Sequence, residues 1–232
     1  EEIDEAYFYR AISCLRQSSA DLASLAIVIV CERFKDGISN RLRKLDVVHV
    51  SKPIADQETL EFASVKDAHT VVILAQDGFG PTSDSINFEL TDRLRALGFK
   101  GRIIVEAVQD GNRARLKKAG ADNVLRPMRA YPELLMRAII APGAEQVIET
   151  LFDSYGEECI RYEVKVASRW LEIIQKLTTQ DLGIPIAYED KQGKIINSPS
   201  SKEHVETEAV FVIVNEGCSR SSSEIEQILK AA

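Results

Sequence analysis

Two glutamates stand at the ends of stretches that we expect to form buried strands. Glu32 directly follows the apolar, β-branched run at residues 25–31, and Glu106 closes the run at residues 102–106. In a dinucleotide-binding sheet, an acid at the carboxyl end of the second strand hydrogen-bonds a ribose hydroxyl. Glu32 stands where that acid is expected, so we predict that it contacts a nucleotide. A solvated acid at a strand end is the plainer alternative.

A polar loop, residues 76–87, follows another apolar run and leads into a helix. Open α/β sheets bind ligands in the crevice outside the carboxyl ends of their strands, where such loops lie. We predict that Asp77, Asp84 and Asn87 of this loop contact the ligand. In the alternative interpretation, the glycines of the loop only form a turn, and Asp84 is an N-cap whose side chain accepts a backbone N–H.

The carboxylate of Glu106 is expected to face the same crevice, where it would contact a cofactor or bind a cation. A Ca²⁺ ion needs several oxygen ligands, and Val108, two residues on, supplies no second acid. Glu106 is therefore the single candidate metal ligand, and Ca²⁺ is a weaker candidate than a nucleotide. The three histidines lack the spacing of metal ligands, and no Ser-His-Asp or Cys-His motif indicates an enzyme.

These residues need a scaffold, and strand and helix patterns alternate along the first half of the chain. Continuous β-branched runs predict buried strands, and apolar residues at three-and-four spacing predict helices. We expect a helix at 1–17, a strand at 25–31, a short helix, a strand at 47–50, a helix at 58–64, a strand at 70–75, a helix at 86–97, a strand at 102–106, a helix at 112–119 and a strand at 124–125. This βαβ series predicts an α/β fold with a Rossmann-like parallel sheet.

A helix precedes the strand that normally comes second in such a sheet. We therefore expect the first strand to be absent from this chain, together with the glycine-rich turn that brings a pyrophosphate to a helix N-terminus. No G-x-G-x-x-G motif occurs in the sequence.

The second half of the chain begins with a longer helical stretch, residues 131–152, and continues as a smaller unit rich in strands. Strands are expected at 160–166, 184–188, 194–197 and 209–214, with a helix at 169–177. We expect three parts: a Rossmann-like N-lobe at 1–128, crossover helices at 129–156 that link the lobes or bind a second copy, and an α+β C-lobe at 157–232.

Composition narrows the classes of partner. The 232 residues include 29 basic and 36 acidic ones, so the net charge is −7 and the overall field repels phosphate backbones. Nucleic acid is therefore not expected as a partner. The longest apolar run is about ten residues, whereas a membrane-spanning helix needs roughly 20. The four scattered cysteines lack C-x-x-C spacing and are typical of reduced thiols in the cytosol.

Several segments together resemble the RCK domain, the regulator of potassium conductance, which is built from TrkA-type N and C domains. The run from Arg102 to Val108, followed by residues 112–127 with their Ala-Gly-Ala-Asp, is similar to the strand, helix and "AGAD-x-V…P" ending of the family. Residues 83–87, Ser-Asp-Ser-Ile-Asn, resemble the family's S-D-x-x-N helix start. Residues 183–188 and 193–199 resemble its C-lobe strands.

This resemblance implies a module at the cytoplasmic face of the cell membrane that assembles with itself into dimers and an octameric gating ring. Its partner would be the pore of a potassium channel or the membrane subunit of a potassium transporter. NAD(H) or an adenine nucleotide would bind in the N-lobe crevice, and the crossover helices would hold the dimer. In calcium-gated relatives several acids line this crevice. Here Glu106 matches one of them, while Leu74 and Val108 stand at positions of others.

Three functions remain open at this stage. The first is a non-enzymatic, ligand-sensing regulatory domain of a potassium channel, which couples ligand or ion binding to pore opening. The second is a soluble regulatory subunit of a potassium uptake transporter. The third is an NAD-dependent oxidoreductase, for which the C-lobe offers His204 in a polar turn and little else.

Overall fold

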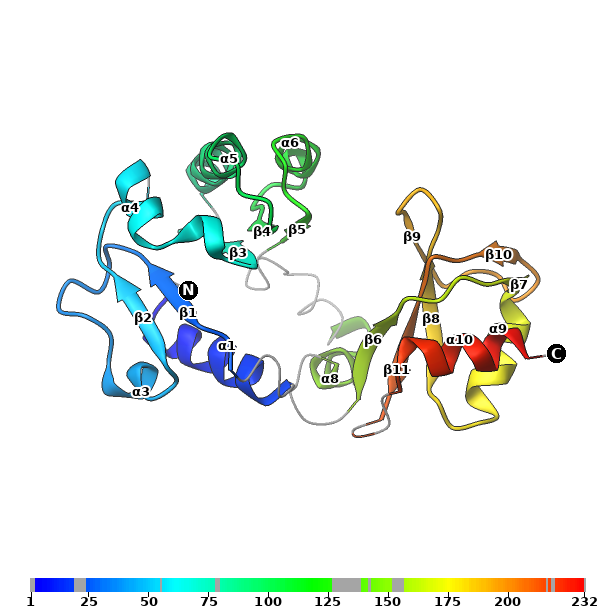
Figure 1. Ribbon diagram of the computed structural model, residues 1–232. Helices are drawn as coiled ribbons and strands as arrows, with labels where there is room; N and C mark the ends of the chain where they lie inside the picture. The colour runs from blue at the N-terminus through cyan, green and yellow to red at the C-terminus, as the bar shows by residue number, and fades with distance from the viewer. Residues whose placement is uncertain are drawn as a thin grey trace. The chain divides into compact units, whose positions relative to one another are not determined.

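The computed structural model describes residues 3–18, 24–54, 56–77, 80–126, 139–141, 143–151, 157–215, 217 and 220–231. The chain divides into two compact units, Glu1–Met136 and Arg137–Ala232, whose elements are labelled in Figure 1. The expected boundaries at 128 and 157 stay predictions, because much of the intervening segment lies outside the described residues.

The N-terminal unit alternates helices and strands as expected. Its elements are α1 (Glu5–Ser18), β1 (Ile27–Val30), α3 (Asn40–Arg43), β2 (Val47–Val50), α4 (Gln57–Phe62), the 3₁₀ turn η1 (Val65–Asp67), β3 (Thr70–Ile73), α5 (Pro81–Ala96), β4 (Arg102–Glu106), η2 (Asp110–Asn112), α6 (Arg113–Lys118) and β5 (Asn123–Leu125).

The strands of this unit pair in parallel, in two groups. β1 pairs with β2, with Ile27 opposite Val47. β4 lies between β3 and β5, with Val71 opposite Ile103. Helices connect successive parallel strands, so the Rossmann-like α/β class expected from the sequence is confirmed.

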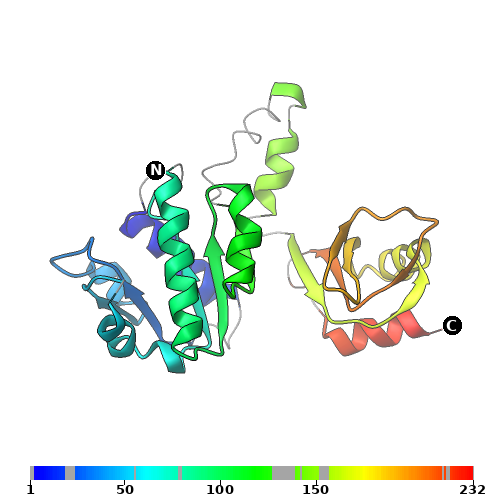
Figure 2. The same ribbon diagram turned by 90° about the horizontal axis from the view of Figure 1, so that it is seen from above.

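Each group of strands has its own apolar core. Ile12 of α1 and Leu42 of α3 pack with Ile29 of β1. On the other group, Leu94 of α5 and Leu116 of α6 are fully buried against the strands. Figures 1 and 2 show α5 and α6 side by side over β3, β4 and β5.

A clamp centred on Arg95 fixes the second group. Its guanidinium donates to the carbonyls of Gly120, Phe99 and Gly101 at 2.9–3.0 Å and to a carboxylate oxygen of Asp122 at 2.8 Å. The same Asp122 oxygen accepts the backbone N–H of Ile103 at 2.7 Å. One side chain of α5 thereby ties the start of β4 to the turn before β5.

The second unit is mainly antiparallel. Its elements are α8 (Ala144–Thr150), β6 (Glu158–Tyr162), β7 (Ala167–Arg169), α9 (Trp170–Thr178), β8 (Ile184–Glu189), β9 (Ile195–Asn197), β10 (His204–Glu206), β11 (Ala209–Val214) and α10 (Ser222–Lys230). The main sheet has the order β6-β11-β8-β9, and β7 pairs with β10. The expected smaller, β-rich C-lobe is thus confirmed.

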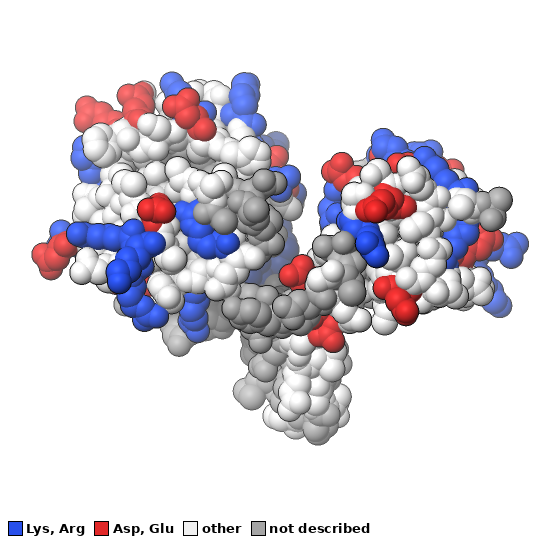
Figure 3. Space-filling model, turned by 60° about the horizontal axis from the view of Figure 1, so that its bottom comes forward, with Lys and Arg blue, Asp and Glu red and all other residues white. Residues whose placement is uncertain are grey.

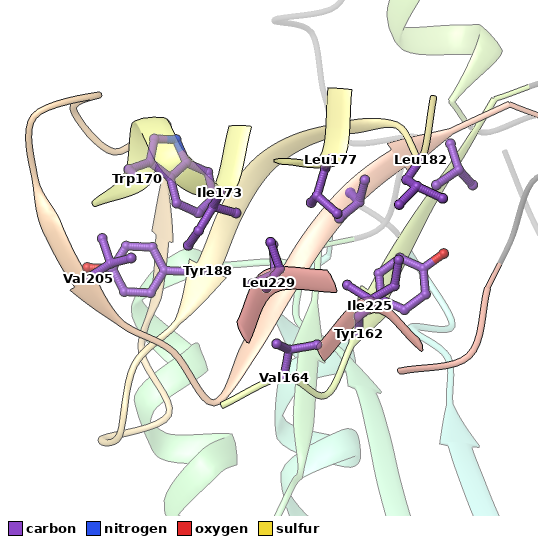
Figure 4. Packing of buried hydrophobic residues seen from close by; sticks show 13 residues of the cluster. Tyr162, Val164, Trp170, Ile173, Leu177, Leu182, Tyr188, Val205, Ile225 and Leu229 are labelled. Atoms are coloured by element: carbon purple, nitrogen blue, oxygen red, sulfur yellow. The ribbon is translucent and has the colours of Figure 1, made fainter. Parts of the chain in front are cut away.

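The helices α9 and α10 supply the core of this unit. Figure 4 shows Ile173 and Leu177 of α9 and Ile225 and Leu229 of α10 among the buried side chains that pack on the sheet. The rings of Trp170 and Tyr188 lie 5.9 Å apart between centroids.

Two local expectations were wrong. The helix expected from residue 86 begins at Pro81, because proline is favoured at the first helical position, and Gly80 rather than Asp84 is its N-cap. Residues 110–112 form a 3₁₀ turn before α6, and the Asp110 carboxylate pairs with Arg113. The polar turn expected around His204 is the short strand β10.

Candidate ligand-binding site

A cavity of about 450 Å³ opens between β1 and β3 in the N-terminal unit. Its floor is apolar, and its rim carries the side chains that follow the carboxyl ends of the two strands. The lining residues are Ile3, Phe8, Ile29, Val30, Cys31, Glu32, Arg33, Phe34, Ile54, Val72, Ile73, Leu74, Gln76, Ile86, Asn87 and Leu90. Its position is that of the crevice in which open α/β sheets bind ligands.

The residues after β1 form one side of the rim. Glu32 lines the cavity and is exposed. Next to it, Arg33 donates from Nη1 to the carbonyl of Ile3 at 2.8 Å, which holds the start of the chain against this rim. Behind them, His49 Nε2 lies 3.0 Å from the carbonyl oxygen and 3.6 Å from the thiol of Cys31.

The residues after β3 form the other side. The N–H of Ala75 donates to the Glu106 carboxylate at 2.8 Å. Asp77 is exposed, and its backbone N–H and carbonyl both bond the hydroxyl of Ser83 at 2.9 Å. The hydroxyl thereby closes the turn that leads into α5.

Asn87 and Glu106 are joined at the inner wall. Asn87 is 1% exposed, lines the cavity and donates from Nδ2 to the carbonyl of Glu106 at 2.8 Å. Glu106 is 8% exposed. Its carboxylate bonds Ala75, so the end of β4 is tied to the end of β3 at the level of the rim.

Asp84 is directed toward protein groups rather than the cavity. It is 3% exposed, and its carboxylate accepts three hydrogen bonds: from Val108 N at 2.6 Å, from Gln109 N at 3.0 Å and from Asn112 Nδ2 at 2.7 Å. These bonds clasp the first turns of α5 to the loop after β4. Asp84 therefore positions the segment that carries Asn87.

Of the five residues expected at the site, the structure thus brings Glu32 and Asn87 into the cavity lining, with Asp77 next to the lining residue Gln76. Glu106 and Asp84 lie behind the wall as anchors of the loops. Within the described residues, no group of three or more histidine, cysteine or acidic side chains is placed to hold a metal ion. Metal binding by Glu106 stays a prediction.

Sequence reasoning missed the aromatic and basic part of the lining. Phe34 and Arg33 follow Glu32 directly, and Phe8 of α1 also faces the cavity. Phe8 and Phe34 contact each other edge to face, with centroids 6.0 Å apart. Arg33 and Phe34 could have been predicted to line the cavity because they directly follow Glu32. The position of Phe8 in the lining could not, because it depends on how α1 packs.

Lysine and arginine side chains gather on the face of this unit that carries α1 and α3, although the whole chain is acidic, as Figure 3 shows. Arg41 of α3 stacks over the ring of Tyr9 of α1 at 3.9 Å. The hydrogen bond from Arg41 lowers the pKa of Tyr9 below its ordinary value of 10.0.

Comparison with known families and structures agrees with this fold. Residues 17–127 match the model of the TrkA-N domain. A sequence comparison with curated proteins gave no match. No helix in the described part of the chain combines the length and apolar character needed to cross a membrane.

Among solved structures, the human SLO3 gating ring matches with a TM-score of 0.60 and 16% identity over 81% of this chain and 39% of that chain. The GsuK channel matches with a TM-score of 0.42 and 20% identity over 91% of this chain and 35% of that one. A structure of the GsuK channel bound to NAD gives a TM-score of 0.38 and 17% identity, over 90% and 39%. The chain thus spans well under half the length of each of these proteins.

Proposed function

We propose that this chain, whose residues 17–127 form a TrkA-N domain, is a ligand-sensing regulatory domain that couples ligand binding in its N-terminal unit to the opening of a potassium channel. The observation that carries the proposal is the cavity at the carboxyl ends of the parallel strands β1 and β3, with Glu32 at its rim. The fold shared with the human SLO3 gating ring supports the same assignment.

The cavity suits NAD(H) or an adenine nucleotide better than a Ca²⁺ ion. The exposed carboxylate of Glu32 can accept hydrogen bonds from ribose hydroxyls. The aromatic and aliphatic lining, with Phe8 and Phe34, can bury an adenine ring. A Ca²⁺ ion takes six to eight oxygen ligands, and the described residues hold no cluster of three candidate ligands.

The regulatory step we propose is a shift between two shapes of an assembly. A ligand moves such an equilibrium only by its difference in affinity for the two states. We propose that copies of this chain form dimers, which assemble into an octameric ring at the cytoplasmic face of the membrane. Closing of the rim on a ligand, from Glu32 after β1 on one side and the residues after β3 on the other, would then change the ring and the pore linked to it.

Calorimetric titration of the whole chain with NAD, NADH, ADP, ATP and CaCl₂, each alone, tests the ligand. We expect a nucleotide to bind and Glu32→Gln to weaken it about 10- to 100-fold, because a hydrogen bond to a charged group contributes about 1.5–3 kcal/mol. The matched control is Asp36→Asn, an exposed acid four residues away that does not line the cavity. Equal affinity of Glu32→Gln and the unchanged chain would contradict this site.

Native mass spectrometry of the same samples tests the assembly. We expect dimers or octamers that retain the nucleotide mass, and a bare monomer under all conditions would contradict the ring. Purification with a potassium pore or with a separate uptake transporter distinguishes a channel from a transporter, for which the chain would act as a regulatory subunit. We propose no catalytic role, and hydride transfer to a carbonyl substrate with NADH would overturn that part.

A further inference from the structure

The face of the N-terminal unit that carries α1 and α3 is basic, although the chain as a whole is acidic (Figure 3). Residues 33–44 contain five basic residues and one acidic residue, whereas the whole chain has a net charge of −7. Five exposed cations come from α1, from the turn after β1 and from α3 with its C-cap: Arg10, Lys35, Arg41, Arg43 and Lys44. We call these five residues the basic face.

The charges of the basic face are not offset by ion pairs. In the part of the chain that the structure describes, none of its five residues pairs with a carboxylate. By contrast, Arg93 and Arg95 of α5 and Arg113 of α6 each pair with an acid. The basic face therefore keeps a positive potential that attracts an external anion.

Contacts with neutral groups hold two of these cations. The guanidinium of Arg41 lies 3.9 Å from the centroid of the half-buried Tyr9 ring. The guanidinium of Arg43 lies against Gly37, where an added Cβ would be only 3.1 Å from its Nη2. These contacts position the two side chains without neutralising them, so binding an anion costs less side-chain entropy.

We propose that the basic face binds the headgroups of an anionic phospholipid membrane. Charge complementarity carries the proposal, because clusters of four to eight Lys and Arg bind anionic lipid surfaces, and each residue strengthens binding about fivefold. The overall field of the acidic chain is repelled by the same surface. The basic face therefore also determines which side of the unit turns toward the membrane.

The form of the basic face favours a lipid surface over a compact ligand or a protein. Its cations are spread over two helices and a turn, and none of them lines the cavity beside β1. A protein partner is held mainly by bulky anchors in pockets, whereas the exposed neighbours of Arg10 on α1 include the small residues Ala6 and Ala11. Mobile lipid headgroups can adjust to an array of cations without such anchors. The inference goes beyond the proposed nucleotide site, and it relies on the proposed function only for the nearness of a membrane.

Two variants of α3 test the proposal. Arg41→Gln/Arg43→Gln/Lys44→Gln removes three charges and leaves the fully buried Leu42 in place. Arg41→Lys/Arg43→Lys keeps the charges but removes the guanidinium contacts with Tyr9 and Gly37. A surface that acts through charge tolerates the second variant, whereas a purely structural role of these arginines does not.

The matched control is Lys66→Gln/Lys100→Gln/Lys118→Gln. These three lysines are exposed and lie outside α1, α3 and the turn after β1. The control therefore changes the net charge as much as the triple variant of α3 does, but it leaves the basic face intact.

The assay is co-sedimentation of the whole chain, without nucleotide, with vesicles of phosphatidylcholine that contain about 30% phosphatidylglycerol or none. We expect binding only to the anionic vesicles at about 0.1 M NaCl, and loss of binding at about 0.5 M, where salt screens the charges. The triple variant of α3 should bind about 100-fold more weakly. The lysine variant and the control should stay within about threefold of the unchanged chain.

Four results would overturn the inference. The first is equal binding to vesicles with and without phosphatidylglycerol. The second is a triple variant of α3 that loses no more affinity than the control. The third is a loss in the lysine variant as large as in the triple variant, which would show that charge is not what binds. The fourth is binding of polyglutamate or duplex DNA through α3 when vesicles do not bind.

Calorimetry with NAD and ADP keeps this inference separate from the proposed nucleotide site. None of the residues changed in α3 lines the cavity, so the triple variant should bind nucleotide normally while it loses the vesicles. If no nucleotide binds the unchanged chain, the proposed nucleotide site fails, and the vesicle result still decides the role of the basic face.

Discussion

Replacing Asp84 by asparagine removes the centre of the clasp between α5 and the loop after β4. The carboxylate accepts two backbone N–H groups, of Val108 and Gln109, and the side-chain amide of Asn112. An asparagine at position 84 keeps one oxygen for Val108. Its NH₂ group would face two donors, and a rotation of the Asn112 amide relieves only one of these conflicts.

The magnitude follows from this count. A hydrogen bond to a charged group contributes about 1.5–3 kcal/mol, and a buried donor left without a partner costs about 1–3 kcal/mol. The Gln109 hydrogen bond is only part-buried, so water can compensate its N–H in part. With the charge lost from a side chain that is 3% exposed, we expect Asp84→Asn to destabilise the N-terminal unit by about 1.5–3 kcal/mol. Asp84→Ala, which removes all three bonds, should cost about 4–6 kcal/mol.

The position of the single tryptophan makes the assay specific. Trp170 is buried in the second unit, so its fluorescence during urea unfolding reports that unit alone. Hydrogen exchange of β4 and α5 amides reports the N-terminal unit. We expect Asp84→Asn to lower the protection of β4 and α5 and to leave the urea midpoint seen by Trp170 unchanged.

The control is Asp110→Asn, because the Asp110 side chain is 63% exposed and makes two ion pairs at the surface, with Arg113 at 2.9 Å and with Arg126 at 3.8 Å. Such pairs contribute at most about 1 kcal/mol. If Asp84→Asn changes the stability of the N-terminal unit no more than Asp110→Asn does, the clasp is not what holds α5. A parallel shift of the Trp170 transition would refute the assumption that the two units unfold separately.

Two further perturbations test the packing and the pH response. Gly120→Ala should destabilise the N-terminal unit by about 2–3 kcal/mol, because Gly120 has φ +109° and a Cβ there would lie 2.6 Å from Arg95 Cγ. The control is Gly98→Ala, at φ +85° with open space around it, which should cost only about 1 kcal/mol. Urea unfolding followed by hydrogen exchange measures both variants, and equal effects would argue against the Arg95 clamp. Glu224 accepts the backbone and side-chain hydrogen bonds of Ser221 in a capping box, which hold its pKa below the ordinary 4.5. The contribution of Glu224 to stability is therefore present above pH 4.5 and is lost as the pH falls through the lowered pKa. The difference in Trp170-monitored stability between the unchanged chain and Glu224→Gln should then shrink below pH 4.5. A constant difference down to pH 2 would contradict this expectation.

The parallel strands could be predicted because their local sequence is unambiguous. The β-branched runs around Ile29, Ile73 and Ile103 are buried in their centres, and the structure forms strands at all three. The run at 102–106 was predicted with its observed bounds. Glycine also marked the ends of α5 and α6, where Gly98 and Gly120 have positive φ.

The short strands β7 and β10 could not be predicted in this way. They pair with each other, with Ser168 opposite Val205, and three residues carry too little pattern to indicate a strand without that partner. The same limit applies to the site. Whether an acid such as Asp84 faces a cavity or a backbone N–H depends on how α5 packs on the loop after β4, which no spacing within residues 76–87 encodes.

The order of strands in the second unit has a consequence for its synthesis. β11 lies between β6 and β8, yet it is the last in sequence of the strands that the structure describes. β6 leaves the ribosome about fifty residues before β11, the strand that pairs with it, and until then its backbone N–H and C=O groups have no partner strand. A unit whose strand pairs with a segment synthesised much later cannot complete its sheet until that segment has been made, and it exposes unpaired strand edges during synthesis. The strands of the N-terminal unit pair with strands close in sequence, so this unit can fold while the second unit is still being synthesised. A chain interrupted before residue 209 would therefore carry a folded N-terminal unit and a second unit whose sheet lacks β11.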